Sequence, residues 1–448
     1  MSASNRTPPS ASTPAQEQGR VALMVRSLRH RNFRLFFGGQ LISLTGTWMD
    51  LIAESWLVYR LTGSSLLLGT MAFASQIPVF LISPIGGTVA DRYNRHRLII
   101  ATQACSMVLA GILAFLTLSH RVHIWHLFVL AAGLGVVNAF DIPARQAFLM
   151  DMVGKEDLMN AIALNSSMFN GARIIGPAIA GILVAKIGEG WCFAANSISF
   201  IAVIAGLLLM KVRKPEFSPS PKSTLENIVE GFRFARHTAP VRALLLLVGL
   251  VSLVGMPYSV LMPIFAAQIL HGGARALGIL MGATGVGALI GALALASKRG
   301  LKGLSKWVAV TSATFGAALI AFSFSRTYYL SILFLIPVGL SMMIQMASTN
   351  TLLQAMVPDQ LRGRVIALYS MMFMGMAPFG AFFAGAVAQK IGAPWTLAIG
   401  GFACLCGSAL FASKLPAIRA EARELILAQG MAGGEPATEM TIGGVSQS

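Results

Sequence analysis

Charged residues are scarce in this chain of 448 residues: they make up 11% of it, against about 25% in ordinary soluble domains. Acidic residues are scarcer still, with 17 Asp and Glu against 34 Lys and Arg. The four cysteines lie inside apolar runs, without the spacing of a metal site or of a disulfide framework. These shortages exclude an ordinary soluble enzyme and a disordered chain.

Hydrophobic residues, in contrast, make up 55% of the sequence. They form twelve runs of about 20 residues, the length that a helix needs to cross the hydrocarbon core of a bilayer. The basic residues form short clusters between these runs, which is typical of membrane-flanking loops rather than of a nucleic-acid-binding surface. The composition therefore predicts an all-α membrane protein with twelve transmembrane helices.

The distribution of Lys and Arg predicts how the chain is oriented. We place 26 of these residues on one side of the membrane and six on the other, with Arg145 and Arg173 inside it. Because positive charge gathers on the cytoplasmic side, both termini are expected in the cytoplasm, and the protein in the inner membrane. The expected parts are a cytoplasmic tail (1–32), a six-helix bundle (33–210), a cytoplasmic linker (211–240), a second six-helix bundle (241–413) and a C-terminal tail (414–448). Within the linker, residues 225–236 predict a short amphipathic helix that lies on the membrane surface.

The two halves of the chain are related in sequence. When the chain is shifted by 204 positions, residues 135–194 align without a gap on residues 339–398, with 19 identities in 60 positions. Parallel six-helix repeats are an architecture of transporters, which bind their substrate near mid-membrane between the repeats.

The second apolar run ends in Gly-Gly-Thr-Val-Ala-Asp-Arg-Tyr-Asn-Arg-His-Arg, residues 86–97. This segment resembles the signature loop of the major facilitator superfamily: Gly87, Asp91, Arg92 and Arg95 match it, while Asn94 and His96 depart from it. We expect Asn94 to occupy a left-handed turn, which Asn tolerates. The second half largely lacks this motif: 204 positions further on, Leu295 stands where the first half has Asp91.

Three further segments indicate which branch of the superfamily the chain resembles. Residues 56–64, 140–145 and 172–177 are similar to the bacterial branch that holds the enterobactin exporter and macrolide efflux proteins. The resemblance implies the major facilitator fold and a charge relay at a cytoplasmic gate, in which Asp91 and Arg95 pair with an acidic residue of the fourth span. Asp141 stands at that position, with Arg145 one turn on. A static ion pair of Asp141 with Arg145 or Arg95 is the alternative.

Polar residues inside the membrane are costly and are therefore candidates for function. Asp50 and Glu54 lie on one face of the first span with Gln40, Ser43 and Thr47. Either carboxylate could take up a proton, as could Asp141; the alternative for Asp50 is a salt bridge, for example with Arg173. The remaining candidates for a substrate cavity are Asn138, Asn170, Arg173, Gln345 and Asn350.

Residues 176–181 bear on the direction of transport. Gly176, Pro177 and Gly181 resemble the motif that accompanies export in antiporter-type facilitators, with Ala180 in place of a glycine. Small-residue helix packing is the alternative, which explains the glycines but not the proline. The tenth and eleventh spans are rich in Met and Phe, which suit a deformable apolar cavity.

The sequence thus predicts a proton-coupled exporter of a bulky amphipathic small molecule, with a siderophore as first cargo and a lipophilic drug such as a macrolide as second. A lysophospholipid flippase of the same fold is the alternative, and a membrane enzyme a remote one. A Walker-type phosphate loop and a catalytic constellation are missing. We therefore expect no enzyme activity, no cofactor other than the proton gradient, no metal and no nucleic-acid partner. The expected partners are the small-molecule substrate and the lipid bilayer, and the expected state is a monomer.

Overall fold

The computed structural model describes residues 25–211, 224–298, 300–301, 303–428, 431–432 and 435–436. Helices account for nearly all of this chain. Those of the first half are η1 (Arg26–Arg29), α2 (Arg31–Thr62), α3 (Ser65–Arg92), α4 (Arg95–Leu118), α5 (Ile124–Ile187) and α6 (Glu189–Leu208).

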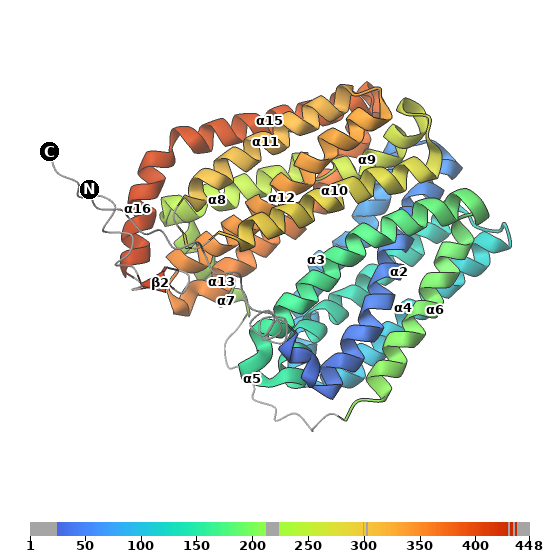
Figure 1. The fold of residues 1–448 in the computed structure, drawn as a ribbon, viewed down its shortest axis with the longest axis horizontal. Helices are drawn as coiled ribbons and strands as arrows, with labels where there is room; N and C mark the ends of the chain where they lie inside the picture. The colour runs from blue at the N-terminus through green and yellow to red at the C-terminus, as the bar shows by residue number, and fades with distance from the viewer. Residues whose placement is uncertain are drawn as a thin grey trace, which may run out of the picture.

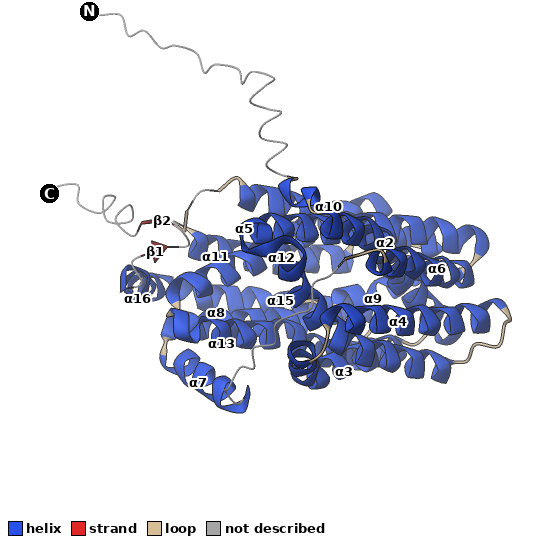
Figure 2. Cartoon of the chain, turned by 90° about the horizontal axis from the view of Figure 1, so that it is seen from below, coloured by secondary structure: helices blue, strands red, loops and turns tan. Residues whose placement is uncertain are grey.

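The second half has more, and shorter, elements. They are α7 (Thr224–His237), α8 (Ala239–Leu250), η2 (Val251–Gly255), α9 (Tyr258–Ile264), η3 (Phe265–Ile269), α10 (Gly273–Ala296), α11 (Leu304–Phe324), α12 (Tyr328–Met356), α13 (Asp359–Ser370), η4 (Met371–Gly375), α14 (Met376–Ile391), α15 (Ala393–Ser413) and α16 (Leu415–Ala428). The elements η2, η3 and η4 are π-helical turns inside longer helices. A two-residue antiparallel pair, β1 (Met431–Ala432) and β2 (Glu435–Pro436), lies beside α16 (Figure 2).

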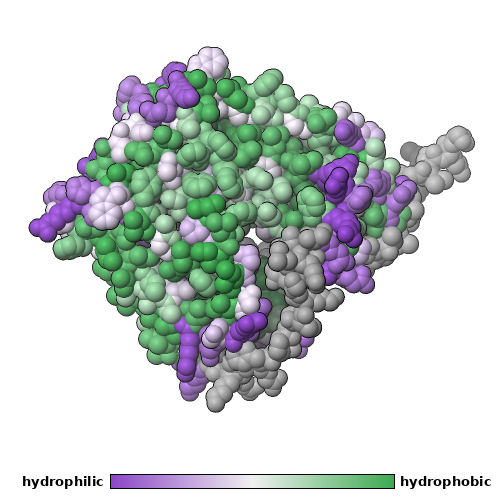
Figure 3. All heavy atoms as spheres, turned by 180° about the vertical axis from the view of Figure 1, so that it is seen from behind, coloured by the Kyte–Doolittle hydropathy of each residue, from purple (hydrophilic) through white to green (hydrophobic). Residues whose placement is uncertain are grey.

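Ten helices of the described chain are long and apolar enough to cross a membrane. One of them, α5, is 64 residues long and bends sharply at Gly154, whose φ of 73° lies in the left-handed region that favours glycine. The helix α2 is not among the ten, although it spans 32 residues. The surface agrees with a membrane setting, because a broad apolar belt separates polar patches at the two ends of the molecule (Figure 3).

The helices gather into two bundles that lie side by side, α2–α6 in one and α8–α15 in the other (Figure 1). The expected membrane-surface helix in the linker is present as α7, but it packs against α13. We name the end of the molecule that holds η1, α7, α13, α16 and the bend in α5 the near end. The far end holds the turns at Gly63 and Gly188, after α2 and α5.

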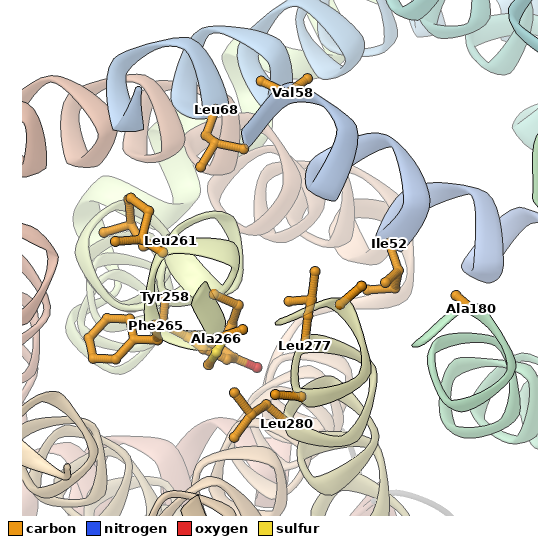
Figure 4. Close-up of a cluster of buried hydrophobic side chains, with 14 of the residues drawn as sticks. Ile52, Val58, Leu68, Ala180, Tyr258, Leu261, Phe265, Ala266, Leu277 and Leu280 are labelled. Carbon is orange, nitrogen blue, oxygen red and sulfur yellow. The ribbon is translucent and has the colours of Figure 1, made fainter. Parts of the chain in front are cut away.

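The buried apolar side chains show where the bundles meet. One cluster crosses from bundle to bundle at the far end, where Ile52 and Leu68 of the first half join Leu261 and Leu277 of the second (Figure 4). Two other clusters fill the near end, and each draws its residues from a single half. The bundles are therefore sealed against each other at the far end and have separate cores at the near end.

Glycines allow this close contact. A Cβ on Gly278 of α10 would lie 2.4 Å from the carbonyl oxygen of Pro177, and one on Gly385 of α14 would lie 2.5 Å from that of Ser65. Gly181 and Gly385 occupy equivalent positions at the offset of 204, so the repeat uses the same glycine twice, against α10 in one half and α3 in the other.

Candidate functional site

The loop between α3 and α4 holds the residues of the predicted gate. The two glycines in the last turns of α3, just before this loop, have unequal roles: a Cβ on Gly86 would lie 2.0 Å from the carbonyl oxygen of Ala139, whereas nothing lies within 4 Å of one on Gly87. Gly86, rather than the motif residue Gly87, is therefore the residue that lets α3 approach α5. Asn94 also differs from the prediction: with φ at −65° it is not left-handed, and its side chain accepts a hydrogen bond from the amide of Arg97 and caps α4.

Arg95 is the centre of the charged network in this loop. Its Nη1 donates to both carboxylate oxygens of Asp151, at 3.2 and 3.3 Å, and its Nη2 lies 3.4 Å from Asp91. Its Nε donates to the carbonyl of Ala90 in the last turn of α3. Arg95 thus ties the end of α3 to α5, while Arg92 is exposed.

Asp141 does not take the place in this network that the resemblance implied. It is buried and accepts hydrogen bonds from Thr102 and Gln103 of α4, and its Oδ2 lies 2.8 Å from Nη2 of Arg145. Thr102 lies seven residues into α4, about 11 Å deeper than Arg95 by helical rise. The predicted pairing of Asp141 with Arg95 is therefore wrong for this structure, and Asp151 takes its place.

Asp151 could have been found from the sequence. Arg95 begins its helix at the edge of the membrane, so that its partner on the fourth span must lie at the same edge. Asp151 stands ten residues beyond Asp141, near the end of the apolar run and three residues before Gly154.

Asp50 and Glu54 lie inside the first bundle. Asp50 is buried beside the side chain of Asn196 on α6, and its Oδ1 has no partner among the described residues. Glu54 is half-buried one turn further along α2. The predicted salt bridge of Asp50 with Arg173 does not form, because α6 covers Asp50.

Arg173 lies where the two bundles meet. Its guanidinium stands over the ring of Trp48 at 5.8 Å, and its Nη2 lies 4.0 Å from the sulfur of Met342 in the second half. The predicted motif residues lie just beyond it: Gly176 packs on Trp48 and Thr45, while Pro177 and Gly181 pack on Gly278. Pro177 cannot donate to the carbonyl of Arg173, and that carbonyl lies against Gly285 of α10. The motif thus forms part of the seal between the halves.

The polar residues predicted for a cavity fall into two groups. Thr47 and Asn170 donate to carbonyls of their own helix, at Ser43 and Ser166, and Asn138 is half-buried on α5. In contrast, Gln40, Gln345 and Asn350 each have a buried polar atom with no partner among the described residues. Ser341, Ser348 and Thr349 share this property and extend it along α12. Buried polar atoms are normally paired, so this stripe is suited to bind water or the polar groups of a substrate.

The two helical bundles are joined by an apolar cluster at one end, have an arginine and a proline on α5 where they meet, and carry a charged loop at the other end. This arrangement is that of a multi-pass membrane transporter of the major facilitator type. The chain belongs to the transmembrane secretion effector family of that superfamily, whose model matches residues 24–433.

Curated relatives agree with this family over most of the chain. The chain is 28% identical to a staphyloferrin A transporter of Staphylococcus aureus, over 84% of this chain and 95% of the relative. It is 27% identical to the multidrug efflux pump Tap of Mycolicibacterium fortuitum, over 78% of this chain and 87% of the pump. It is 25% identical to an enterobactin exporter of Citrobacter koseri, over 76% of this chain and 81% of the exporter. The predicted branch of the superfamily is thus confirmed.

Solved structures share the fold. A bacterial homologue of the iron transporter ferroportin, in an inward-facing state, has a TM-score of 0.65 at 18% identity and covers 86% of this chain and 98% of that one. A peptide transporter in complex with sulfate has a TM-score of 0.70 at 12% identity and covers 87% of this chain and 95% of that one. At these identities the likeness shows the fold alone.

Proposed function

We propose that this protein exports a small molecule across the bacterial inner membrane by alternating access, with twelve crossings and both termini in the cytoplasm. In this count α2 is the first crossing, and the two legs of α5, on either side of Gly154, are the fourth and fifth. The single observation that carries the mechanism is the apolar cluster that joins the bundles only at the far end. With the near end cytoplasmic, the structure is an inward-facing state, ready to load cargo from the cytoplasm.

Asp50 is the carboxylate best suited to couple transport to protons. A buried carboxylate is costly when charged, and Asp50 has no cation within ion-pair distance among the described residues. Asp141 already holds Arg145 and is less suited, and Glu54 is only half-buried. In proteoliposomes, Asp50→Asn should abolish export driven by a pH gradient while exchange of cargo down its own gradient continues. Gradient-driven export at the wild-type rate would exclude Asp50 as the coupling site.

The relatives support the choice of cargo. The names of the staphyloferrin A transporter, the Tap pump and the enterobactin exporter give siderophores and drugs, which are bulky and amphipathic, and none of these names gives a lipid. The unpartnered polar stripe on α12, beside Met342 and Met346, offers hydrogen-bonding and deformable apolar groups to such molecules. We therefore propose a siderophore as the first candidate and a lipophilic drug as the second.

The test is deletion of the gene in its own host, with complementation, followed by profiling of cells and medium under iron-poor and iron-rich growth. Retention of a siderophore by the iron-starved mutant, reversed by the wild-type gene, is the expected result. If siderophores are unchanged, a panel of drugs and dyes tests the second candidate. Transfer of labelled lysophospholipid in proteoliposomes, with no drug export, would favour a flippase instead.

A further inference from the structure

A short basic segment before the first crossing is fastened to the bend of α5. It comprises Arg26, Ser27, Arg29 and His30, which we name the strap. The backbone amide and the hydroxyl of Ser27 both donate to Oδ1 of Asn160, at 2.9 and 2.6 Å. The hydroxyl also lies within hydrogen-bond distance of the carbonyl of Asp157. Ser27 is fully buried by these contacts.

Asp157 receives the charged side chains of the strap. Its carboxylate lies 2.5 Å from Nε of Arg26, 2.8 Å from Nη2 of Arg29 and 2.7 Å from Nε2 of His30. Its side chain is completely buried, whereas those of the two arginines are 42% and 58% exposed. The hydrogen bond from His30, and then the charges of Arg26 and Arg29, lower the pKa of Asp157 below its ordinary value. The contribution of these bonds to stability is therefore complete above the ordinary pKa of Asp and is lost as the pH falls through the lowered one.

The residue that anchors the strap, Asp157, is six residues from the gate carboxylate of Asp151 along the chain. Asp151, which holds Arg95, and Asp157, which holds the strap, lie on either side of the bend at Gly154. A glycine with a left-handed backbone has no side chain to fix it, and a Cβ at this position would meet nothing within 4 Å. The orientation of Asp151 toward Arg95 thus depends on what holds the bend, and the strap is attached three residues beyond it.

The second half has an equivalent ion pair between the segment before its first crossing and a later helix, which we name the second fastening. Here the segment before the crossing carries the negative charge and the later helix the positive one. There Glu230 of α7, which precedes the seventh crossing, pairs with Arg364 of α13. Arg364 occupies the position of Asn160 at the offset of 204, so that both halves fasten the segment before their first crossing to the same place. Ala355 stands at the position of Asp151, so this second fastening has no gate carboxylate beside it.

We propose that the strap, through Asp157 and Asn160, is a positioning device that fixes the bend of α5 and so holds Asp151 against Arg95 in the cytoplasmic gate. This inference rests on the proposed transport function only in its last step, where the gate controls flux. The fastening of the second half is its internal control, because it has the same construction without the gate residue.

The test is a double-mutant cycle in proteoliposomes. Asp157→Asn should lower flux roughly fivefold or more, and should lower it no further in a protein that already carries Arg95→Gln, because both act through one contact. Glu230→Gln combined with Arg95→Gln should give effects that add. Additive effects of Asp157→Asn and Arg95→Gln would overturn the proposal, because a merely structural residue would act independently of Arg95.

A second measurement does not depend on transport. Hydrogen exchange of the amides in residues 86–97 should be faster in Asp157→Asn than in the wild type and unchanged in Glu230→Gln. If Asp157→Asn does not fold, Ser27→Ala and Arg29→Gln remove single contacts of the strap and should each speed the same exchange. Unchanged exchange in all of these strap variants would overturn the positioning role. Faster exchange in a protein that moves no cargo would uphold the strap and refute the transport function.

Discussion

Gly86 and Gly87 are neighbours on α3 that the structure places in opposite environments. Gly86→Ala should destabilise the protein by about 1–3 kcal/mol, because the added methyl group meets the carbonyl of Ala139 and α3 must move away from α5. Gly87→Ala has open space and should be neutral or slightly stabilising, since alanine favours helix. Thermal unfolding of the two purified variants in detergent measures the difference. Equal unfolding temperatures would show that the close contact of α3 with α5 is wrong.

Two aspartates of the gate region should respond differently to neutralisation. Asp141→Asn removes a buried partner of Arg145, Thr102 and Gln103 and should cost about 3 kcal/mol of stability. Asp91→Asn removes a carboxylate whose side chain is 69% exposed and should cost less than ~1 kcal/mol. Both should reduce flux in proteoliposomes, so unfolding and transport must be measured on the same preparations. Wild-type flux in both variants would show that neither the contact of Asp91 with Arg95 nor the buried contacts of Asp141 are needed for transport.

At the scale of the helices, α16 makes a contact that can be tested separately. Ile418, Ala422 and Ile426 recur every four residues and are buried against the near end of the second bundle. The carboxylate of Glu421 on the same helix accepts a hydrogen bond from the amide of Ala239, at the start of α8, where helical amides otherwise have no partner.

Ile418→Ala should therefore lower the free energy of unfolding by about 2–4 kcal/mol. Leu427→Ala, on the exposed face of the same helix, should change it little, because Leu427 is already 38% exposed. Chemical unfolding in detergent micelles checks both. If the two variants lose the same stability, α16 does not dock on the bundle through this face.

The helices themselves could be predicted from the sequence, because long apolar runs and basic clusters are dictated by the membrane. The glycine-rich repeat could be predicted as well, since 19 identities without a gap need no knowledge of the structure. The partner of Arg95 could be predicted only by taking the depth of Arg95 into account, because Asp141 and Asp151 both lie on α5. Other partners of polar residues could not be predicted. The strap depends on a contact across 127 or more residues, which the charges alone do not specify.

At the scale of the whole molecule, the apolar cluster that joins the two bundles at the far end is a seal that the proposed transport cycle requires to open. Gly278 and Gly181 meet in this seal: a Cβ on Gly278 would lie 2.4 Å from the carbonyl oxygen of Pro177, and one on Gly181 would lie 3.1 Å from the Cα of Gly278. A larger residue at Gly278 should thus raise the free energy of the state with a closed far end. It should have little effect on the proposed outward-open state, in which the two halves separate at the far end. Substitutions that alter one state only are expected to shift populations rather than to unfold the protein.

Gly278→Val places its Cβ 2.4 Å from the carbonyl of Pro177, a strain of about 1–3 kcal/mol that should raise the population open at the far end roughly fivefold or more. Gly282→Val, one turn along the same helix, is the matched control, because its Cβ would lie 3.9 Å from the nearest atom. Ala180→Cys, introduced after removal of the four native cysteines, reports opening through its reaction with an impermeant maleimide added from the far side. Labelling should be faster with Gly278→Val and unchanged with Gly282→Val. Equal labelling in both would show that contact between the two glycines does not control the far end, and that the alternation depends on the near-end gate alone.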